Sequence, residues 1–141
     1  MTSQIAYPVS IKGVVVREDK VLLLRNEREE WELPGGRIEP GESPEQCVVR
    51  EIAEEARWRV IATAILDSWM YYIDAADKNV FIVTYGCYPV QADEPVLSHE
   101  HKEIGLFGES DVEGLVMPAG YKRSIKAWFA QLRADASKQA W

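Results

Sequence analysis

One stretch constrains this chain more than any other. It runs from Leu33 to Trp58 and reads LPGGRIEPGESPEQCVVREIAEEARW. The glycines and the Pro40-Gly41 pair are typical of a loop with tight turns. After them, Ser43 can cap a helix, Pro44 suits the first helical position, and Gln46 completes an S-x-x-Q capping box. The stretch therefore predicts a glycine-rich loop that leads directly into a helix.

The predicted helix has an apolar stripe and an acidic face. The apolar positions recur at i, i+3, i+4 and i+7, which are Val49, Ile52, Ala53 and Ala56. At roughly 100° per residue, Glu51, Glu54 and Glu55 fall on the face opposite this stripe. Solvent alone would account for such a face. However, Glu51 and Glu55 repel each other at i, i+4, and Arg50 cannot neutralise three carboxylates. A hard divalent cation such as Mg²⁺ could neutralise all three.

The spacing of these residues resembles the signature of the Nudix hydrolase family, G-x5-E-x7-R-E-U-x-E-E-x-G-U, in which U is aliphatic. Gly36 is followed after five residues by Glu42, and after seven more by Arg50-Glu51. The pair Glu54-Glu55 then completes the ionisable positions, all of which match. The lead-in WELPG (31–35) also looks like that of the family.

Two positions at the end of the signature depart from the family pattern. Arg57 stands where the family has glycine, and Trp58 stands where it has an aliphatic residue. Glycine after a helix usually serves a left-handed cap, so a side chain there costs on the order of 1 kcal/mol. The departures concern the exit from the helix and leave the carboxylates intact.

The resemblance implies a single domain over residues 1–141, of the α/β class, folded as an α/β/α sandwich around a mixed β-sheet. It also implies a hydrolase that needs Mg²⁺, for which Mn²⁺ can substitute. Its substrate would be a nucleoside diphosphate linked to another moiety, cleaved at a pyrophosphate bond. By the same resemblance, the metal ligands are Glu54 and Glu55 with the Gly35 carbonyl, while Glu51 is either a ligand or the base that activates water. Arg50 would orient a glutamate, and Glu42 beside Gly36 would support the site from the loop.

A second polar stretch, SHEHKEIGLF (98–107), carries His99, Glu100, His101 and Glu103. From the residues alone it reads as a polar loop before a strand, with both histidines at the surface. The H-x-H spacing lacks the second pair that a zinc site needs. In the Nudix family a glutamate near this place often supplies a metal ligand or the general base, so Glu103 and Glu100 are candidates. Arg25 and Arg37 are candidate phosphate contacts.

Composition excludes several classes of protein. The chain has 141 residues, 47% of them hydrophobic, which suits one globular domain. The net charge is −7 and no basic run exceeds Lys122-Arg123, so a polymeric nucleic acid is not expected as a partner. Two cysteines are too few for a disulfide framework, and Cys47 is expected to be a small, partly buried packing residue. Neither a signal peptide nor a membrane helix is recognisable, so we expect a cytoplasmic protein with a small nucleotide substrate and, as a further partner, a second copy in a homodimer.

The rest of the chain predicts strands followed by a final helix. The expected strands are 7–17 and 21–24, which form a hairpin, then 60–66, 68–73 and 79–88, the last of them central in the sheet. Residues 89–98 read as a loop, and Trp31 is expected in the core. The final helix presents Ile125, Trp128, Phe129 and Leu132 on one face after Tyr121. Residues 134–141 are expected to fray.

The sequence leaves the substrate open. The ADP-ribose-hydrolysing branch typically has a proline about 15 residues beyond the signature, and none occurs between Trp58 and Tyr88. Nucleoside triphosphates, nucleotide sugars and dinucleoside polyphosphates are the other candidates. A catalytically silent module of the same fold that binds a nucleotide or a protein is the alternative function, although such modules usually lack one of the carboxylates. A structural domain whose acidic helix only faces solvent is a third interpretation.

Overall fold

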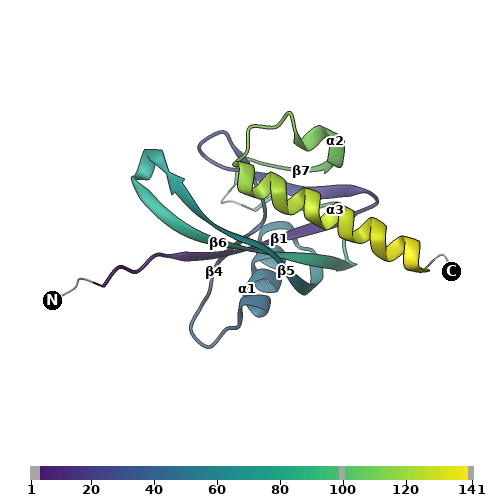
Figure 1. The fold of residues 1–141 in the computed structure, drawn as a ribbon, viewed down its shortest axis with the longest axis horizontal. Coiled ribbons are helices and arrows are strands. Elements are labelled where there is room, and N and C mark those ends of the chain that lie inside the picture. The colour runs from purple at the N-terminus through teal and green to yellow at the C-terminus, as the bar shows by residue number, and fades with distance from the viewer. Residues whose placement is uncertain (1–3, 99–100, 140–141) are drawn as a thin grey trace.

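The structure is a computed structural model that describes residues 4–98 and 101–139. Figure 1 shows its strands between two helices that lie on opposite sides. The elements in chain order are β1 (Val9–Arg17), β2 (Lys20–Arg25), β3 (Trp31–Glu32), β4 (Gly35–Arg37), α1 (Pro44–Ala56), β5 (Arg59–Ile73), a short 3₁₀ turn (Asp74–Ala76), β6 (Lys78–Gln91), β7 (Glu103–Gly108), α2 (Glu109–Val112) and α3 (Ala119–Gln139).

The strands form a mixed sheet in the order β3-β2-β1-β6-β5. β1 and β6 run parallel, with Val9 opposite Phe81 and Val15 opposite Cys87. The other pairings are antiparallel, including β4 on β1 and β7 on β2. β6 lies between β1 and β5, which confirms the prediction that this strand is central.

Alternate residues of the sheet pack against different helices, as a strand's period of two requires. Ile11 and Val15 of β1 belong to a cluster with Val48 and Ile52 of α1. Val14 belongs to a second cluster that includes four residues on one face of α3, namely Tyr121, Ile125, Trp128 and Phe129. Two separate cores therefore lie on the two faces of one sheet, and the predicted α/β/α sandwich is confirmed.

The sheet corrects two of the expected boundaries. Residues 60–66 and 68–73 belong to one strand, β5, because register shifts between Ala62 and Ile65 and between Ile65 and Asp67 take up the extra residues as bulges. β6 continues beyond the expected loop boundary to Gln91. Pro89 is tolerated there because it lies opposite Val60, next to a further register shift.

The final helix is longer than expected. α3 extends to Gln139, so residues 134–139 are helical, while 140–141 lie outside the described part of the chain. Trp31, expected in the core, is half-buried and packs edge-on against Phe107 with ring centroids 4.7 Å apart. In residues 4–98 and 101–139, no helix combines the length and apolar composition that crossing a bilayer requires.

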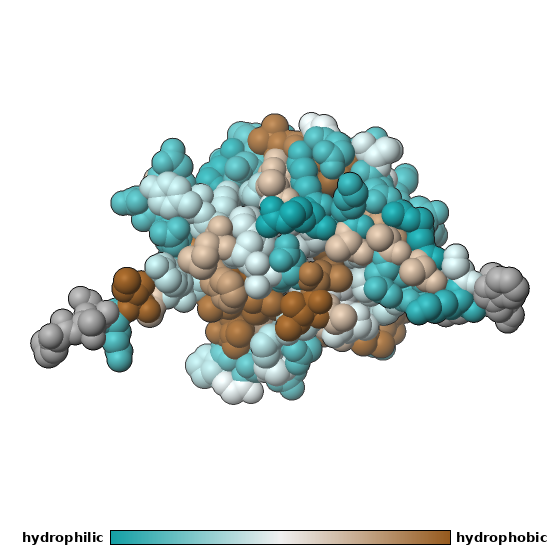
Figure 2. All heavy atoms as spheres, in the orientation of Figure 1, coloured by the Kyte–Doolittle hydropathy of each residue, from teal (hydrophilic) through white to brown (hydrophobic). Residues whose placement is uncertain are grey.

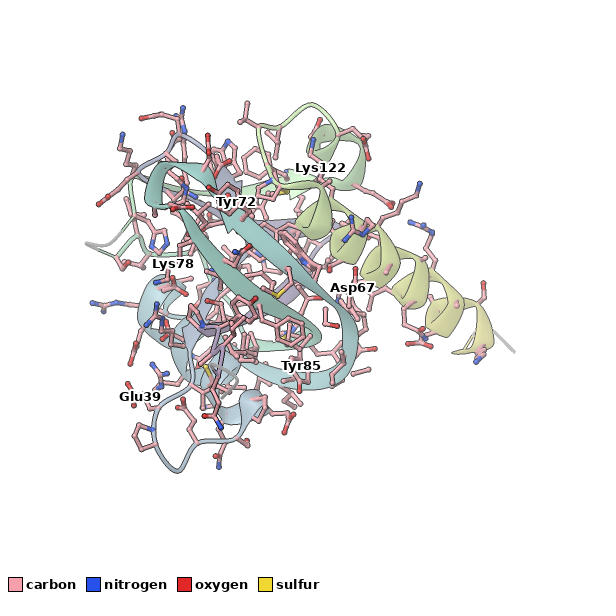
Figure 3. All side chains as sticks on the ribbon, turned by 60° about the vertical axis from the view of Figure 1, so that its left-hand side comes forward. Glu39, Asp67, Tyr72, Lys78, Tyr85 and Lys122 are labelled. Atoms are coloured by element: carbon pink, nitrogen blue, oxygen red, sulfur yellow. The ribbon has the colours of Figure 1, made fainter. Side chains whose placement is uncertain are left out.

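Exposed apolar side chains gather on part of the molecular surface. Figure 2 shows apolar surface on the strands below α3. On β5 and β6 the exposed large apolar side chains are Ile61, Ile65, Met70, Tyr72, Tyr88 and Val90. Figure 3 shows Tyr72 and Lys78 near the turn of the β5–β6 hairpin, and Glu39 in the loop that leads to α1.

Candidate functional site

α1 begins as the sequence predicts. The Ser43 hydroxyl accepts from the Gln46 N–H at 3.1 Å, and the Gln46 side chain accepts from the Ser43 N–H at 2.9 Å. The buried face, however, differs from the predicted stripe. Val49 is only half-buried and Ala53 is exposed. The residues buried on α1 are Cys47, Val48, Ile52, Glu55 and Ala56. Cys47 is a packing residue as expected, but it is fully buried and not partly buried.

This rotation of the buried face gives different environments to the three carboxylates that were expected on one face of the helix. The Glu54 side chain is 59% exposed, that of Glu51 is 17% exposed and that of Glu55 is 5% exposed. The carboxylates therefore run from the surface into the interior. Burial of Glu55 requires compensation from other elements, which periodicity within α1 cannot reveal.

In the more exposed part of the site, Arg50 donates hydrogen bonds to three carboxylates. Its guanidinium contacts Glu42 at 2.6 and 3.0 Å, Glu51 at 3.0 Å and Glu54 at 3.2 Å. It also donates to the Arg37 carbonyl at 3.1 Å, which ties α1 to the end of β4. The hydrogen bonds from Arg50 and from the Glu39 N–H lower the pKa of Glu42 to about 2. Arg50 thus holds the loop and helix carboxylates together.

Glu51 lies against the backbone of β4. A Cβ added at Gly36 would meet the Glu51 carboxyl carbon at 2.6 Å and its two oxygens at 2.7 and 2.8 Å. Glycine at position 36 therefore leaves to the Glu51 carboxylate a space that a side chain would occupy. We call this space beside the Gly36 backbone, which the Glu51 carboxylate fills, the cradle.

Glu55 is held on both carboxylate oxygens. Oε1 accepts from the Gly35 N–H at 2.8 Å, and Oε2 lies 3.4 Å from His101 Nε2. The same His101 nitrogen lies 3.1 Å from Glu32. His101 is thus enclosed, with a side chain 9% exposed, and the expectation that it lies at the surface is wrong. The physical reason is that its partners come from β3 and α1, which are distant in sequence.

Lys12 supplies a buried positive charge behind these carboxylates. Lys12 lies directly opposite Gly35 and is the last residue of β1 that pairs with β4. Further along β1, from Val16, the strand pairs with β2. The residue is only 8% exposed. Burial by itself lowers the pKa of Lys12. The opposite effect of the nearby acidic groups is larger, so the pKa is raised overall and the ammonium stays charged; these groups are Tyr121, Glu32, Glu55 and Glu51.

The buried carboxylates respond differently to this charge. Burial opposes ionisation of Glu32, but Lys12 together with hydrogen bonds from His101 and Asn26 lowers its pKa to about 2. For Glu55 burial prevails over Lys12 and the Gly35 N–H, and its pKa rises to about 7. The pKa of His101 is raised chiefly by its hydrogen bond to Glu32. The interior of the site is a four-membered ionic cluster, Lys12–Glu32–Glu55–His101.

Sequence reasoning missed most of this cluster. Lys12 is a single charge inside the apolar run VSIKGVVV (9–16), and that interruption was the available signal. Glu32 appears in the sequence only as part of the lead-in to the signature. Neither feature indicates a partner, because the partners meet only when β1, β3 and α1 come together.

Two of the other predicted site residues, Glu103 and Arg25, pair with each other. Glu103 pairs with Arg25 across the β2–β7 ladder at 3.1 Å, and Arg25 also contacts Glu29 at 2.7 Å. In the described residues, no hydrogen bond or ion pair joins Glu103 to the carboxylates of α1. Arg37 is exposed and offers its carbonyl to Arg50. Glu100 lies outside the described residues.

The donor set suits a hard divalent ion in its chemistry. Glu51, Glu54 and Glu55 offer carboxylate oxygens beside the Gly35–Gly36 backbone, and oxygen ligands are those Mg²⁺ and Mn²⁺ prefer. Within residues 4–98 and 101–139, no three acidic, histidine or cysteine groups converge as ligands on one point. Arg50 donates hydrogen bonds to Glu51 and Glu54. In their chemistry the carboxylates therefore fit a divalent ion, and Arg50 is a positive side chain beside them.

Known proteins resemble this chain at two levels, as a family model and as individual relatives. A family model described as the NUDIX domain matches residues 6–129. A putative ADP-ribose pyrophosphatase, YjhB, of Bacillus subtilis (strain 168) is 44% identical over 62 residues, which cover 41% of this chain and 30% of that protein. A putative 8-oxo-dGTP diphosphatase of the same organism is 43% identical over 53 residues, covering 36% of each. The matched stretches thus span well under half of these relatives.

Similarity to solved structures extends over most of the chain. The crystal structure of a MutT protein from Methanosarcina mazei Go1 superposes with a TM-score of 0.76 at 25% identity. The match covers 92% of this chain and 98% of that one. The layers and the strand order are therefore those of a known architecture.

Proposed function

This chain belongs to the Nudix family, and we propose that it is a metal-dependent hydrolase that cleaves a pyrophosphate bond in a nucleoside diphosphate linked to another moiety. The observation that carries the proposal is the arrangement around β4: Glu51 and Glu55 both lie against the Gly35–Gly36 backbone, while Arg50 binds Glu51 and Glu54. A solvent-facing acidic helix needs no such cradle.

A divalent ion, when bound, would neutralise phosphate oxygens and lower the pKa of water. The ligands in the proposal are Glu54, Glu51 and Glu55 with the Gly35 carbonyl, and Mg²⁺ is the expected ion. Glu54 reaches solvent and is the carboxylate that can leave Arg50 most easily. Glu51, held at the cradle, is either a ligand or the general base. Glu103 and Glu100 stay predictions for the base or an additional ligand.

The remaining residues position these groups and balance their charge. The Gly35 N–H and His101 fix the orientation of Glu55, and Lys12 offsets the charge of the inner carboxylates. Arg50 keeps Glu42 and Glu51 in place and retains a positive charge next to the site. Arg25 and Arg37 are the proposed phosphate contacts. Fixed charges of this kind need little rearrangement when charge develops on the substrate.

The proposed substrates are nucleotides that contain a nucleoside diphosphate. One relative is named for ADP-ribose and another for 8-oxo-dGTP, so the common element is a nucleoside diphosphate core. A small nucleotide is the proposed partner, without a nucleic acid polymer or a membrane, and the cytoplasm is the proposed location. For a homodimer, the exposed apolar residues of β5 and β6 are the surface we propose.

Hydrolysis of a nucleotide panel with Mg²⁺, with Mn²⁺ and with chelator tests the proposal. The panel contains nucleoside triphosphates, ADP-ribose, nucleotide sugars and dinucleoside polyphosphates. Glu54→Gln should abolish both turnover and the rise in melting temperature caused by Mn²⁺, while the fold stays intact. The matched control is Glu27→Gln, an exposed glutamate outside the site. Turnover by Glu54→Gln at the wild-type rate would refute the mechanism. Silence of the wild type across the panel, with Mn²⁺ still bound, would favour the silent binding module.

A further inference from the structure

Two side chains from distant elements hold the segment that follows β6. Arg17, the last residue of β1, donates from Nη1 to the carbonyls of Ala92, at 3.0 Å, and of Asp93. Trp58, directly before β5, donates from Nε1 to the same Asp93 carbonyl at 2.8 Å. One backbone oxygen therefore accepts from both side chains, and we call Arg17 and Trp58 the clamp.

The two residues of the clamp also contact each other. Trp58 is 1% exposed, and the Arg17 guanidinium carbon lies 5.3 Å from the centroid of its ring, within range of a cation–π contact. Arg17 also reaches the Glu94 carboxylate at 3.4 Å. Three residues beyond Asp93, the Val96 N–H donates to the Ala56 carbonyl at the end of α1. The segment 92–96 is thus anchored to the exit of the helix that carries the candidate metal ligands.

The other end of this connection is fixed to β2. The Lys102 N–H donates to the Arg25 carbonyl at 3.1 Å, and the β2–β7 ladder starts with Glu103 opposite Arg25. His101 comes one residue before that anchor, and its Nε2 contacts both Glu32 and Glu55. In sequence, His101 therefore lies between two anchored parts of the chain, the segment 92–96 and Lys102.

We propose that Arg17 and Trp58 are positioning residues that hold the segment 92–98 where His101 can reach Glu55 and Glu32. The inference rests on the proposed function, in which Glu55 is a metal ligand. It also gives a reason for tryptophan at position 58, where the family pattern has an aliphatic residue. An aliphatic side chain would fill the core but has no N–H to donate to Asp93.

The clamp acts on Glu55 through His101. One oxygen of Glu55 accepts a hydrogen bond from the Gly35 N–H of β4, which lies outside the segment 92–98. The other oxygen is oriented by His101 alone among the described side chains. Loss of the clamp should therefore loosen one oxygen of this carboxylate and leave the Gly36 cradle and the Arg50 contacts unchanged.

Arg17→Met is the first variant, because Arg17 is partly exposed and its loss does not open the core. Trp58→Phe is the second, since it keeps an aromatic ring but removes the N–H. Arg59→Met is the matched control, an exposed arginine whose side chain has no hydrogen bond or ion pair to any described residue. Thermal unfolding of each variant shows that it is folded.

The first readout is the NMR signal of the His101 ring in histidine-labelled protein without substrate. The chain has two histidines, so loss of one ring signal in His101→Gln assigns the other. Arg17→Met and Trp58→Phe should both move the His101 ring signals toward those of a solvent-exposed histidine, and Arg59→Met should leave them unchanged. Unmoved signals in folded Arg17→Met and Trp58→Phe would overturn the proposal.

The second readout is a double-mutant cycle on turnover and on Mn²⁺ affinity. Arg17→Met should lower kcat/KM by about 10-fold in the wild-type background, because small displacements in a reactive site are costly, but by less than about 2-fold in His101→Gln. Equal losses in both backgrounds would show that Arg17 does not act through His101. If no compound of the panel is hydrolysed, the proposed function fails, and the NMR signals and the Mn²⁺ dissociation constant still decide the role of the clamp.

Discussion

The replacement Gly36→Ala tests the cradle of Glu51 most directly. The new Cβ would lie 2.6 Å from the Glu51 carboxyl carbon, whereas ordinary van der Waals contact begins at 3.4 Å. The carboxylate must therefore move by roughly 0.8 Å. A move of that size is enough to take Glu51 out of hydrogen-bond range of Arg50 Nη1, which is now 3.0 Å away.

The displacement predicts a large loss of activity with little loss of stability. A misplacement of about 1 Å in a reactive site costs on the order of 100-fold in rate, which corresponds to about 2.7 kcal/mol. Gly36 has no positive φ, so alanine does not strain the backbone, and the reduced entropy of the unfolded chain favours folding by about 0.4–1 kcal/mol. That gain offsets part of the local crowding.

The assay compares kcat/KM and melting temperature for Gly36→Ala, the wild type and Gly114→Ala. The control adds a Cβ whose nearest contact is the Asp111 carbonyl at 3.8 Å, so it should behave as wild type. Activity of Gly36→Ala within about 2-fold of wild type would refute the reasoning, because Glu51 would then tolerate displacement from the cradle.

Three further predictions concern charge and the helix exit. The pKa of Glu32 is lowered from 4.5 to about 2, so its ionised form stabilises the fold above pH 4.5, and this stability is lost as the pH falls toward 2. Urea unfolding of the wild type and of Glu32→Gln measures this contribution. The difference between their free energies of unfolding should shrink between pH 4.5 and about pH 2. Lys12→Met should lower the free energy of unfolding by about 3–5 kcal/mol at pH 7, because Glu32 and Glu55 lose their buried counter-charge, and a variant as stable as wild type would contradict the ionic cluster. Arg57 adopts φ 59° at the end of α1, so Arg57→Gly should raise stability by about 0.5–1 kcal/mol without changing kcat, and a lower melting temperature would contradict a strained cap.

The sequence predicted what depends on local periodicity and on fixed spacing. The capping box at Ser43 and Gln46 is local, since both partners lie within one turn of the helix. The buried face of α3 follows from helical spacing, and the central position of β6 follows from apolar residues on both sides of the strand. The signature placed Arg50 among carboxylates because its partners in α1 are one and four residues away.

Tertiary structure decided how far each carboxylate lies from solvent. Glu51, Glu54 and Glu55 are alike in sequence, yet only Glu55 is buried, because a backbone N–H of β4 and a histidine before β7 meet its oxygens. Lys12 is charged and enclosed for the same reason, since its neighbours come from three other elements. The free energy of a buried charge depends on groups brought together across the whole chain, so spacing alone could identify the donors but not their environments.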